Sequence, residues 1–549
     1  MLLSFYFSEL KQVEQNYMNS NDRITPEGTK DYLFKECKLK RKAEKTLRNL
    51  FETQGYDEVM TPALEYYDVF SKGIGRISQD EMYTLTDNSG RLVTMRPDST
   101  KPIARLYASR LKQAKLPLKL YYNQTVFRRN IRLSKFSDEI TQIGVELLGA
   151  EGLAADIEIL LLAAQSMKEL FGDNFRIEIG HMGIISSLLE QPSTGDKDAL
   201  RSALAAKNYP EIEAIAGAEK DGIFSNLFSL FGGTEVLARA KKLFDYDGAA
   251  NALEELTQAA NALEEKGFKN NIIIDLAVIN EYDYYTGLVF KGYVAGQGKE
   301  VLSGGRYDTL YTDYDLDLSA IGFAVNIDEV VKVLGNEAAT KQVKDTFTIA
   351  LTKGRLEEQA LRLLENSGLD CSSIRNKGRK LIINLDDKYE ILFAKARDVV
   401  TYVEYGVADA GVVGKDVLLE MGRPVHEVLD LGFGKCRFSL AAQKGQDFYS
   451  GYKLKTVATK YPEFTKSFFN SRNMDVEIIK IEGSVELAPL LSLADGIVDL
   501  VETGSTLKEN GLEIIEDICN ISARLIVNSA ALRLKKRTIE ELIGRLSND

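Results

Sequence analysis

The pattern of predicted strands and helices changes near residue 345, and this change constrains the fold of the 549-residue chain more than any other feature. A chain of this length exceeds what one hydrophobic core supports, so we expect several cores. The segment 335–344 is short, polar and without apolar periodicity, which is typical of a linker. The expected organisation is a leader over 1–23, a first domain over 24–334, this linker, and a second domain over 345–549.

The first domain is predicted to be of the α+β class. A helix over 32–54 precedes short strand-like runs such as 92–96, 118–122 and 142–148, which favour an antiparallel sheet. Alanine-rich and leucine-rich spacing over much of 187–266 indicates a helical insertion.

The second domain has a different rhythm, in which apolar strands alternate with helices. Strands are predicted at 346–351 and 389–394, with a helix at 357–366 between them. This alternation is typical of an α/β fold with parallel sheets, whose ligands lie at the carboxyl ends of the strands.

Composition excludes several classes of function. The formal net charge of −12 argues against a general nucleic-acid binder, and no apolar run is long enough to span a bilayer. Neither a secretion signal nor a membrane segment is indicated, so we expect a cytoplasmic protein. The four cysteines are scattered and there are two histidines, which makes a metal cluster, a disulfide framework or histidine-based nucleophilic catalysis improbable.

The strongest chemical signal lies at residues 494–511, where an apolar strand, 497–501, leads into the turn Thr503-Gly504-Ser505-Thr506 and then a helix. Backbone N–H groups, hydroxyls and a helix N-terminus can together bind a monophosphate. Asp495 and Asp499 just upstream could accept hydrogen bonds from ribose hydroxyls or hold Mg²⁺ through water. Alternatively, the tetrapeptide only forms a turn and a helix cap.

This loop resembles the phosphoribosyl-pyrophosphate loop of ATP phosphoribosyltransferases. Four further segments resemble that family in the same order, namely 350–356, 394–416, 457–462 and 483–489. The resemblance covers residues 345–549 and is to the short form of the enzyme. It implies a two-lobed fold like that of periplasmic binding proteins, with the chain crossing between the lobes near 434 and 525 and the active site in the cleft.

The implied reaction joins N1 of ATP to C1 of phosphoribosyl pyrophosphate and releases pyrophosphate, the first step of histidine biosynthesis. Adenine N1 already carries a lone pair, so positioning and charge neutralisation, with Mg²⁺ as cofactor, should dominate. The resemblance implies catalytic roles for Lys353, Lys395 and Arg397. It implies ATP contacts at Lys353, Gly354, Arg355, Arg379, Lys395, Arg397 and Lys460, and phosphoribosyl-pyrophosphate contacts at Asp495, Asp499, Glu502, Thr503, Gly504, Ser505 and Thr506. Each basic residue could instead be a solvated surface charge, and Ser505 stands where the family often has arginine.

Residues 24–334 resemble the catalytic core of histidyl-tRNA synthetase. The matching segments are 59–65, 95–100, 126–129, 142–146, 283–287, 304–308 and 320–324. Two departures concern ATP: Glu329 stands where the synthetase has its motif 3 arginine, and Asn280 replaces a second arginine. A carboxylate would repel a triphosphate, so amino-acid activation is not expected.

The synthetase's pocket for histidine is better retained. By the resemblance, Asp98 and Thr100 would bind the α-amino group, Arg128 and Gln142 the carboxylate, and Glu146, Tyr284 and Tyr285 the imidazole. Asp98 replaces the usual glutamate. The alternative is a polar core without a ligand.

A synthetase-like core without activation chemistry resembles the regulatory subunit of short-form ATP phosphoribosyltransferases, here fused to the catalytic part. The leading hypothesis is therefore a homo-oligomeric enzyme inhibited by histidine. The alternatives are a non-catalytic receptor of the periplasmic-binding-protein type and an active histidyl-tRNA synthetase. No membrane or nucleic-acid partner is expected.

Overall fold

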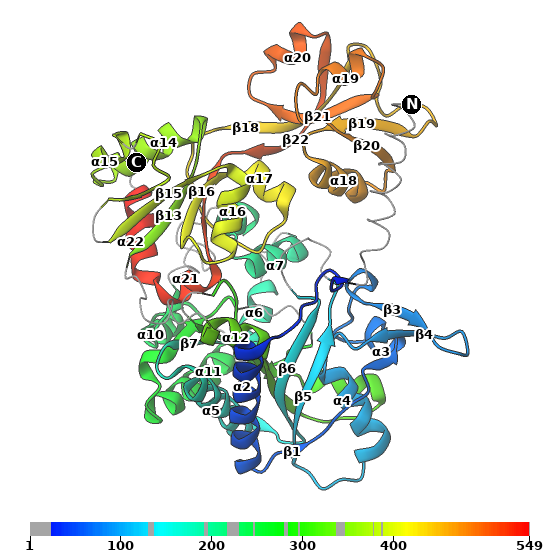
Figure 1. Cartoon of the computed structure of the whole chain (residues 1–549), viewed down its shortest axis with the longest axis vertical. Helices are drawn as coiled ribbons and strands as arrows, with labels where there is room; N and C mark the ends of the chain where they lie inside the picture. The colour runs from blue at the N-terminus through cyan, green and yellow to red at the C-terminus, as the bar shows by residue number, and fades with distance from the viewer. Residues whose placement is uncertain are drawn as a thin grey trace, which may run out of the picture.

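The computed structural model of the chain describes residues 23–129, 137–190, 196–216, 230–244, 247–278, 284–294, 297–335, 346–376, 378–385 and 388–547. The expected leader and linker lie outside the described residues except for Arg23 and Gly335, and so does Asn280. Figure 1 shows one large sheet with its helices at the bottom and two smaller sheets stacked above it.

The first domain is built on a nine-stranded sheet in the order β1-β5-β6-β12-β11-β10-β7-β9-β8. All neighbours pair antiparallel except β1 with β5 and β7 with β9, so the predicted antiparallel sheet is confirmed. The strands are β1 (Asp57–Glu58), β5 (Leu118–Phe127), β6 (Glu139–Leu148), β7 (Phe175–His181), β8 (Phe231–Gly232), β9 (Ile272–Asp275), β10 (Leu288–Val294), β11 (Leu302–Arg306) and β12 (Ala320–Asn326).

Three helices, α2 (Phe34–Thr53), α5 (Gly152–Phe171) and α12 (Ile327–Gly335), pack on this sheet. In α2 the buried residues Ala43, Leu47, Leu50 and Phe51 recur at the helical period and form one apolar stripe, which explains why the sequence folds as an amphipathic helix here. The predicted helix over 32–54 is confirmed.

Smaller elements complete the first domain. The expected helical insertion is present as α6 (Met182–Leu189), α7 (Lys197–Ala206), α8 (Tyr209–Ala216), α10 (Glu235–Leu243) and α11 (Asp247–Glu265). A three-stranded sheet, β2-β4-β3, comprises β2 (Leu64–Tyr66), β3 (Thr84–Thr86) and β4 (Leu92–Met95), and α3 (Asp68–Ser71) and α4 (Thr100–Leu106) lie beside it.

The second domain has two lobes with one sheet each. The first sheet has the order β14-β15-β13-β16-β23-β17 and the second β20-β19-β21-β18-β22. The strands are β13 (Phe347–Thr352), β14 (Ile382–Asn384), β15 (Tyr389–Ala394), β16 (Ala410–Gly414), β17 (His426–Asp430), β18 (Cys436–Gln443), β19 (Lys455–Thr459), β20 (Val476–Lys480), β21 (Gly496–Val501), β22 (Leu512–Ile521) and β23 (Ala523–Val527).

Both sheets are mixed, so the expectation of parallel sheets is wrong for part of each. Parallel pairing is confined to β13 with β15 and β16, and to β19 with β20 and β21. The chain leaves the first lobe between β17 and β18, at 431–435, and returns between β22 and β23, at Ser522. The outgoing and returning strands must run in opposite directions, and they pair antiparallel in both sheets.

Helices surround the two sheets of the second domain. They are α14 (Arg355–Asn366), α15 (Ser372–Arg375), α16 (Ala396–Glu404), α17 (Lys415–Met421), α18 (Pro462–Ser471), α19 (Leu487–Leu490), α20 (Ser505–Glu509), α21 (Ser529–Leu534) and α22 (Lys536–Leu546). Within the described part of the chain, no helix has the length and apolar character needed to cross a membrane.

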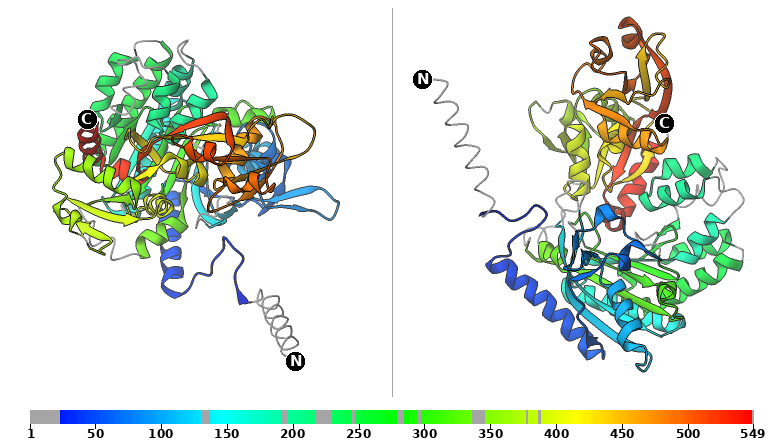
Figure 2. Two further views of the ribbon diagram at one scale, coloured as in Figure 1. Left: turned by 90° about the horizontal axis from the view of Figure 1, so that it is seen from above. Right: turned by 90° about the vertical axis from the view of Figure 1, so that its right-hand side faces the viewer.

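Helix α21 connects the two domains, because it contacts β7 and β10 of the large sheet (Figures 1 and 2). Its Arg533 is buried in the first domain, where Nη2 lies 2.9 Å from Oε1 of Glu178. Asp275 and Lys207, an ion pair in the first domain, lie in the same cluster. Four charged side chains therefore share one buried junction.

His426 of β17 completes this junction as a neutral ring. Burial, reinforced by the charge of Arg533, lowers its pKa well below the usual value. Nδ1 lies 2.9 Å from the carbonyl oxygen of Ala206, to which it can only donate, so Nε2 is the acceptor for Arg533 Nη1 at 3.0 Å and for the Ser529 hydroxyl at 2.7 Å.

A second contact between the domains lies at the carboxyl end of α16. Gly298 is so close to it that a β-carbon there would stand 2.0 Å from the carbonyl oxygen of Glu404. Asn528 joins this end of α16 to α21: its Nδ2 donates to the carbonyl of Val403 at 2.7 Å, while its Oδ1 accepts from the backbone N–H groups of Ala530 and Ala531 at 2.9 and 3.0 Å.

Candidate active site

Basic side chains from distant segments meet at one edge of the first lobe. Strands β13 and β15 run parallel with Thr352 opposite Ala394, so the residues that follow them, Lys353 and Lys395, lie side by side. The Lys353 N–H donates to the carbonyl of Ala394 at 2.8 Å. The register of the two strands thus brings together two of the residues predicted to bind ATP.

The neighbours of these lysines lie at the same edge. Gly354 has φ = 102°, a conformation that favours glycine, and this turn starts α14 at Arg355. Arg397 lies in the first turn of α16. Arg379 lies on an exposed turn before β14, which reaches this edge because Leu381 bonds antiparallel to Phe393.

The predicted phosphate loop is present in the second lobe as residues 502–506, between β21 and α20. Gly504 has φ = 79°, which allows the sharp turn from strand to helix. Glu502, Thr503, Ser505 and Thr506 are exposed, and the hydroxyl oxygens of Thr503 and Ser505 lie 3.0 Å apart. Two exposed hydroxyls therefore lie at the start of α20, where the Ser505 N–H donates to Thr503 Oγ1 at 3.4 Å.

The loop and the basic edge meet at the boundary between the lobes. Arg355 Nη1 in the first lobe lies 2.7 Å from Glu502 Oε2 in the loop. Both side chains are more than half exposed, so this ion pair adds little stability and can exchange for charged ligands.

A second polar contact joins the two lobes. The Tyr461 hydroxyl of the second lobe donates to Asp416 of the first lobe at 3.1 Å. Burial raises the pKa of Asp416 and of Asp499, and the charge of Lys460 opposes both shifts. Lys460 and Asp499 are predicted site residues, whereas Asp416 and Tyr461 lie in the segments quoted for the resemblance without an assigned role.

Asp495 does not belong to this site, contrary to the prediction. It precedes β21, whereas the phosphate loop follows β21, and a strand of this length separates them by roughly 20 Å. Its Oδ2 accepts from the backbone N–H of Thr456 at 2.9 Å, and Lys453 lies 3.5 Å from Oδ1. Proximity in sequence misled the prediction, because the intervening residues form an extended strand.

The first domain contains a second polar pocket, centred on the buried carboxyl group of Glu146 on β6. Thr100 donates to its Oε1 at 2.9 Å, and the Tyr307 hydroxyl donates to its Oε2. Burial raises the pKa of Glu146 to about 8, although both hydrogen bonds oppose this shift. Thr100, predicted to bind the α-amino group, is therefore bonded to Glu146, predicted to bind the imidazole. Tyr307 was not among the predicted residues.

Other predicted residues gather around Glu146. Asp98 is buried and its Oδ2 accepts from the N–H of Lys101 at 3.1 Å, at the start of α4. Arg128 Nε donates to the carbonyl of Pro97 at 2.9 Å. The centroid of the Tyr285 ring lies 4.7 Å from that of Tyr284. Burial raises the pKa of Tyr285; the charges of Glu146 and Asp98 add to this shift, and that of Arg128 opposes it.

Comparison with known proteins assigns a family to each part of the chain. The histidyl-tRNA synthetase family model matches residues 28–330, and the ATP phosphoribosyltransferase family model matches residues 395–548. An ATP phosphoribosyltransferase from Clostridium kluyveri is 60% identical over 199 residues, 36% of this chain and 91% of that relative. The chain belongs to the ATP phosphoribosyltransferase family.

The first domain of this ATP phosphoribosyltransferase is similar to a regulatory subunit. The ATP phosphoribosyltransferase regulatory subunit of Clostridium acetobutylicum is 39% identical over 321 residues, 57% of this chain and 79% of that protein. A crystal structure described as an ATP phosphoribosyltransferase regulatory subunit/histidyl-tRNA synthetase from Bacillus halodurans C is 29% identical, with a TM-score of 0.52, and covers 68% of this chain and 93% of that chain. The predicted fusion is confirmed.

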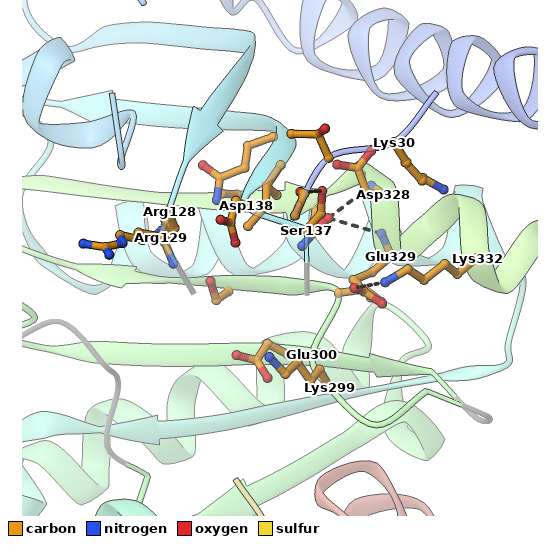
Figure 3. Close-up of a pocket in the computed structure, with 18 of the residues that line it drawn as sticks. Lys30, Arg128, Arg129, Ser137, Asp138, Lys299, Glu300, Asp328, Glu329 and Lys332 are labelled. Atoms are coloured by element: carbon orange, nitrogen blue, oxygen red, sulfur yellow. Dashed lines mark hydrogen bonds and ion pairs between the residues drawn. The ribbon is translucent and has the colours of Figure 1, made fainter. Parts of the chain in front are cut away.

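The first domain also has a cavity of about 680 Å³, shown in Figure 3. Arg128 and Gln142 line it, so it adjoins the pocket around Glu146. Glu329, which stands in the place of the synthetase's ATP-binding arginine, also lines it and pairs with Lys332 at 2.6 Å. Both acidic and basic side chains line the cavity, a mixture that does not favour a triphosphate.

Proposed function

We propose that this ATP phosphoribosyltransferase transfers the 5-phosphoribosyl group of phosphoribosyl pyrophosphate to N1 of ATP and releases pyrophosphate. The observation that carries this proposal is the position of Lys353, Lys395 and Arg355 on one wall of a cleft, opposite a phosphate loop on the other. The family to which the chain belongs has this activity in its name, and the first step of histidine biosynthesis is the reaction that it implies.

Each side of the cleft would bind one substrate. In the second lobe, the N–H groups and hydroxyls of residues 503–506 would bind the 5-phosphate, and Asp499 would accept hydrogen bonds from ribose hydroxyls. In the first lobe, Lys353, Lys395 and Arg397 would bind the triphosphate and neutralise the departing pyrophosphate.

The reaction forms a bond from N1 to C1 and breaks the bond from C1 to the pyrophosphate oxygen. The adenine lone pair supplies the electrons for the new bond, and pyrophosphate leaves with the pair from the old one. Because the chain only has to align these atoms and stabilise charge, holding the two substrates together between the lobes would itself accelerate the reaction. The overall arrangement, two lobes joined by two strand connections, supports a fold of the periplasmic-binding-protein type.

Mg²⁺ is the expected cofactor. In the described part of the chain, no group of three histidine, cysteine or acidic side chains is arranged to hold a metal ion. Mg²⁺ commonly uses one or two carboxylates together with substrate phosphates and water. We therefore propose that the ion enters with the pyrophosphate group, with Asp499 or Glu502 as its partners on the chain.

We further propose that histidine binds beside Glu146 and inhibits the transfer. Support comes from the similarity to a regulatory subunit and from the grouping of Asp98, Arg128, Glu146 and Tyr285. The predicted cytoplasmic location and homo-oligomeric assembly are part of the same proposal.

An assay of phosphoribosyl-ATP formation, with and without histidine, tests both proposals. The chain should release pyrophosphate only when ATP, phosphoribosyl pyrophosphate and Mg²⁺ are present. Histidine should lower the rate, and Glu146→Gln should shift the inhibition curve to about two- to tenfold higher histidine, because an ordinary hydrogen bond contributes about 0.5 to 1.5 kcal/mol. Histidine-dependent exchange of pyrophosphate into ATP would instead support an active synthetase, and absence of any pyrophosphate release would support a receptor.

A further inference from the structure

Helix α17 of the first lobe presents two carboxylates to the second lobe. Asp416 and Glu420 are four residues apart, so they lie on one face of the helix. Asp416 accepts from the Tyr461 hydroxyl at 3.1 Å, and Glu420 Oε2 accepts from the backbone N–H groups of Glu463 and Phe464, both at 3.1 Å. This face of α17 is therefore bonded to the beginning of α18 in the opposite lobe.

The contact of Glu420 is well matched to its charge. The N–H groups of Glu463 and Phe464 are at the second and third positions of α18, where a helix has no internal acceptors and a positive dipole end. The Glu420 side chain is only 5% exposed. A buried carboxylate thus satisfies two open donors across the boundary between the lobes.

The second oxygen of the same carboxylate faces Arg397, which is proposed to bind ATP. Glu420 Oε1 lies 3.7 Å from Arg397 Nη2, in the first turn of α16, and the guanidinium group remains 56% exposed. Glu482 lies in the second lobe just after β20; the hydrogen bond and charge of Lys480 lower its pKa most, and the charges of Arg397 and Lys460 add to this shift. Arg397 therefore contacts the Glu420 carboxylate and lies within electrostatic range of the opposite lobe.

We propose that Glu420 is a positioning residue for the transfer reaction: it holds Arg397 toward the triphosphate of ATP while its other oxygen fixes the second lobe. This inference rests on the proposed function. One side chain makes both contacts, so the orientation of Arg397 depends on the approach of the lobes. Glu420 contacts no substrate and acts through Arg397.

The test compares Glu420→Gln with wild type in ATP affinity, measured by titration calorimetry, and in KM for each substrate. Glutamine retains an oxygen for the N–H groups of α18 but removes the charge that faces Arg397. We expect the Kd and KM for ATP to rise about two- to fivefold, as is typical of a partly exposed ion pair, and the KM for phosphoribosyl pyrophosphate to stay within about twofold.

A double-mutant cycle separates positioning from simple packing. In an Arg397→Gln background, Glu420→Gln should cause no further loss of ATP affinity, because its effect passes through Arg397. Glu463→Gln is the matched control: it removes one exposed carboxylate at the same helix terminus and should leave ATP affinity unchanged.

Equal losses with and without Arg397, or unchanged ATP affinity in Glu420→Gln, would overturn the proposal. If the glutamine variant fails to fold, Glu420→Asp keeps the charge but is one methylene too short for both contacts, and a wild-type ATP affinity in that variant would overturn it as well. A wild-type chain that binds ATP without releasing pyrophosphate would disprove the proposed activity, yet the affinity comparison would still decide the role of Glu420.

Discussion

Arg533 is the side chain whose removal should most weaken the junction between the two domains. It is 3% exposed, and Glu178, its partner, is fully buried. Arg533→Met would leave Glu178 without its nearest cation and His426 Nε2 without one of its donors. Removing one partner of a buried ion pair destabilises a protein by about 3 to 5 kcal/mol, a large part of the about 5 to 15 kcal/mol that stabilises a typical domain.

Urea unfolding followed by circular dichroism measures this loss, since the chain has no tryptophan to report by fluorescence. Burial already raises the pKa of Glu178 and Arg533 opposes this, so the variant's carboxyl group should take up a proton. The double variant with Glu178→Gln should therefore recover part of the loss, because the Tyr293 hydroxyl, 3.2 Å from Glu178, can still donate to an amide oxygen.

The control for this experiment is Arg375→Met, which removes an exposed arginine from an ion pair with Glu365 at 2.6 Å. Its unfolding midpoint should match that of wild type, because solvent screens this pair. If Arg533→Met lowered the free energy of unfolding by less than about 1 kcal/mol, the reasoning would be refuted, because exposed surface ion pairs contribute that little.

Three further predictions concern other parts of the chain. The pKa of His426 is lowered in the folded chain, so below about pH 6.5 the unfolded chain binds a proton that the folded chain does not, and the free energy of unfolding falls. In urea unfolding at several pH values, His426→Asn should reduce the slope of this free energy against pH by up to about 1.4 kcal/mol per pH unit. Gly298→Ala should lower Tm and weaken histidine inhibition, because its β-carbon would strike the end of α16, whereas Gly544→Ala, with no atom within 4 Å, should do neither. Asp495→Asn should leave the KM for phosphoribosyl pyrophosphate unchanged in steady-state kinetics, whereas Asp499→Asn should raise it; equal effects would restore Asp495 to the site.

The sequence predicted the elements of the fold better than their connections. The apolar stripe of α2 and the alternation of β6 depend on local periodicity, and both elements are present where expected. The direction of the strands beside the crossings depends on where the chain passes from one lobe to the other, and local sequence patterns do not indicate that position. The mixed character of both sheets was therefore missed.

In the candidate site, too, local sequence patterns indicated some residues, whereas contacts between distant segments were not foreseen. Lys353 and Lys395 follow parallel strands, and the strand register brings these two predicted residues side by side. Glu420 and Arg533 were not predicted, because each looks like an ordinary helical charge until a partner from another lobe or domain is seen. Asp495 was assigned to the site from its proximity in sequence and from the family resemblance, but an extended strand separates it from the loop.

Asn528 restricts how this chain can vary in evolution. Its side chain donates to the end of α16 and accepts from the beginning of α21. An aspartate would lack the donor, and a leucine would lack both the donor and the acceptor. A glutamine would be one methylene too long for this geometry. Few other single substitutions preserve both bonds. Among relatives that fuse the same two domains, asparagine at this position should mark those in which α16 and α21 are joined in this way, and its replacement should coincide with changes on both helices.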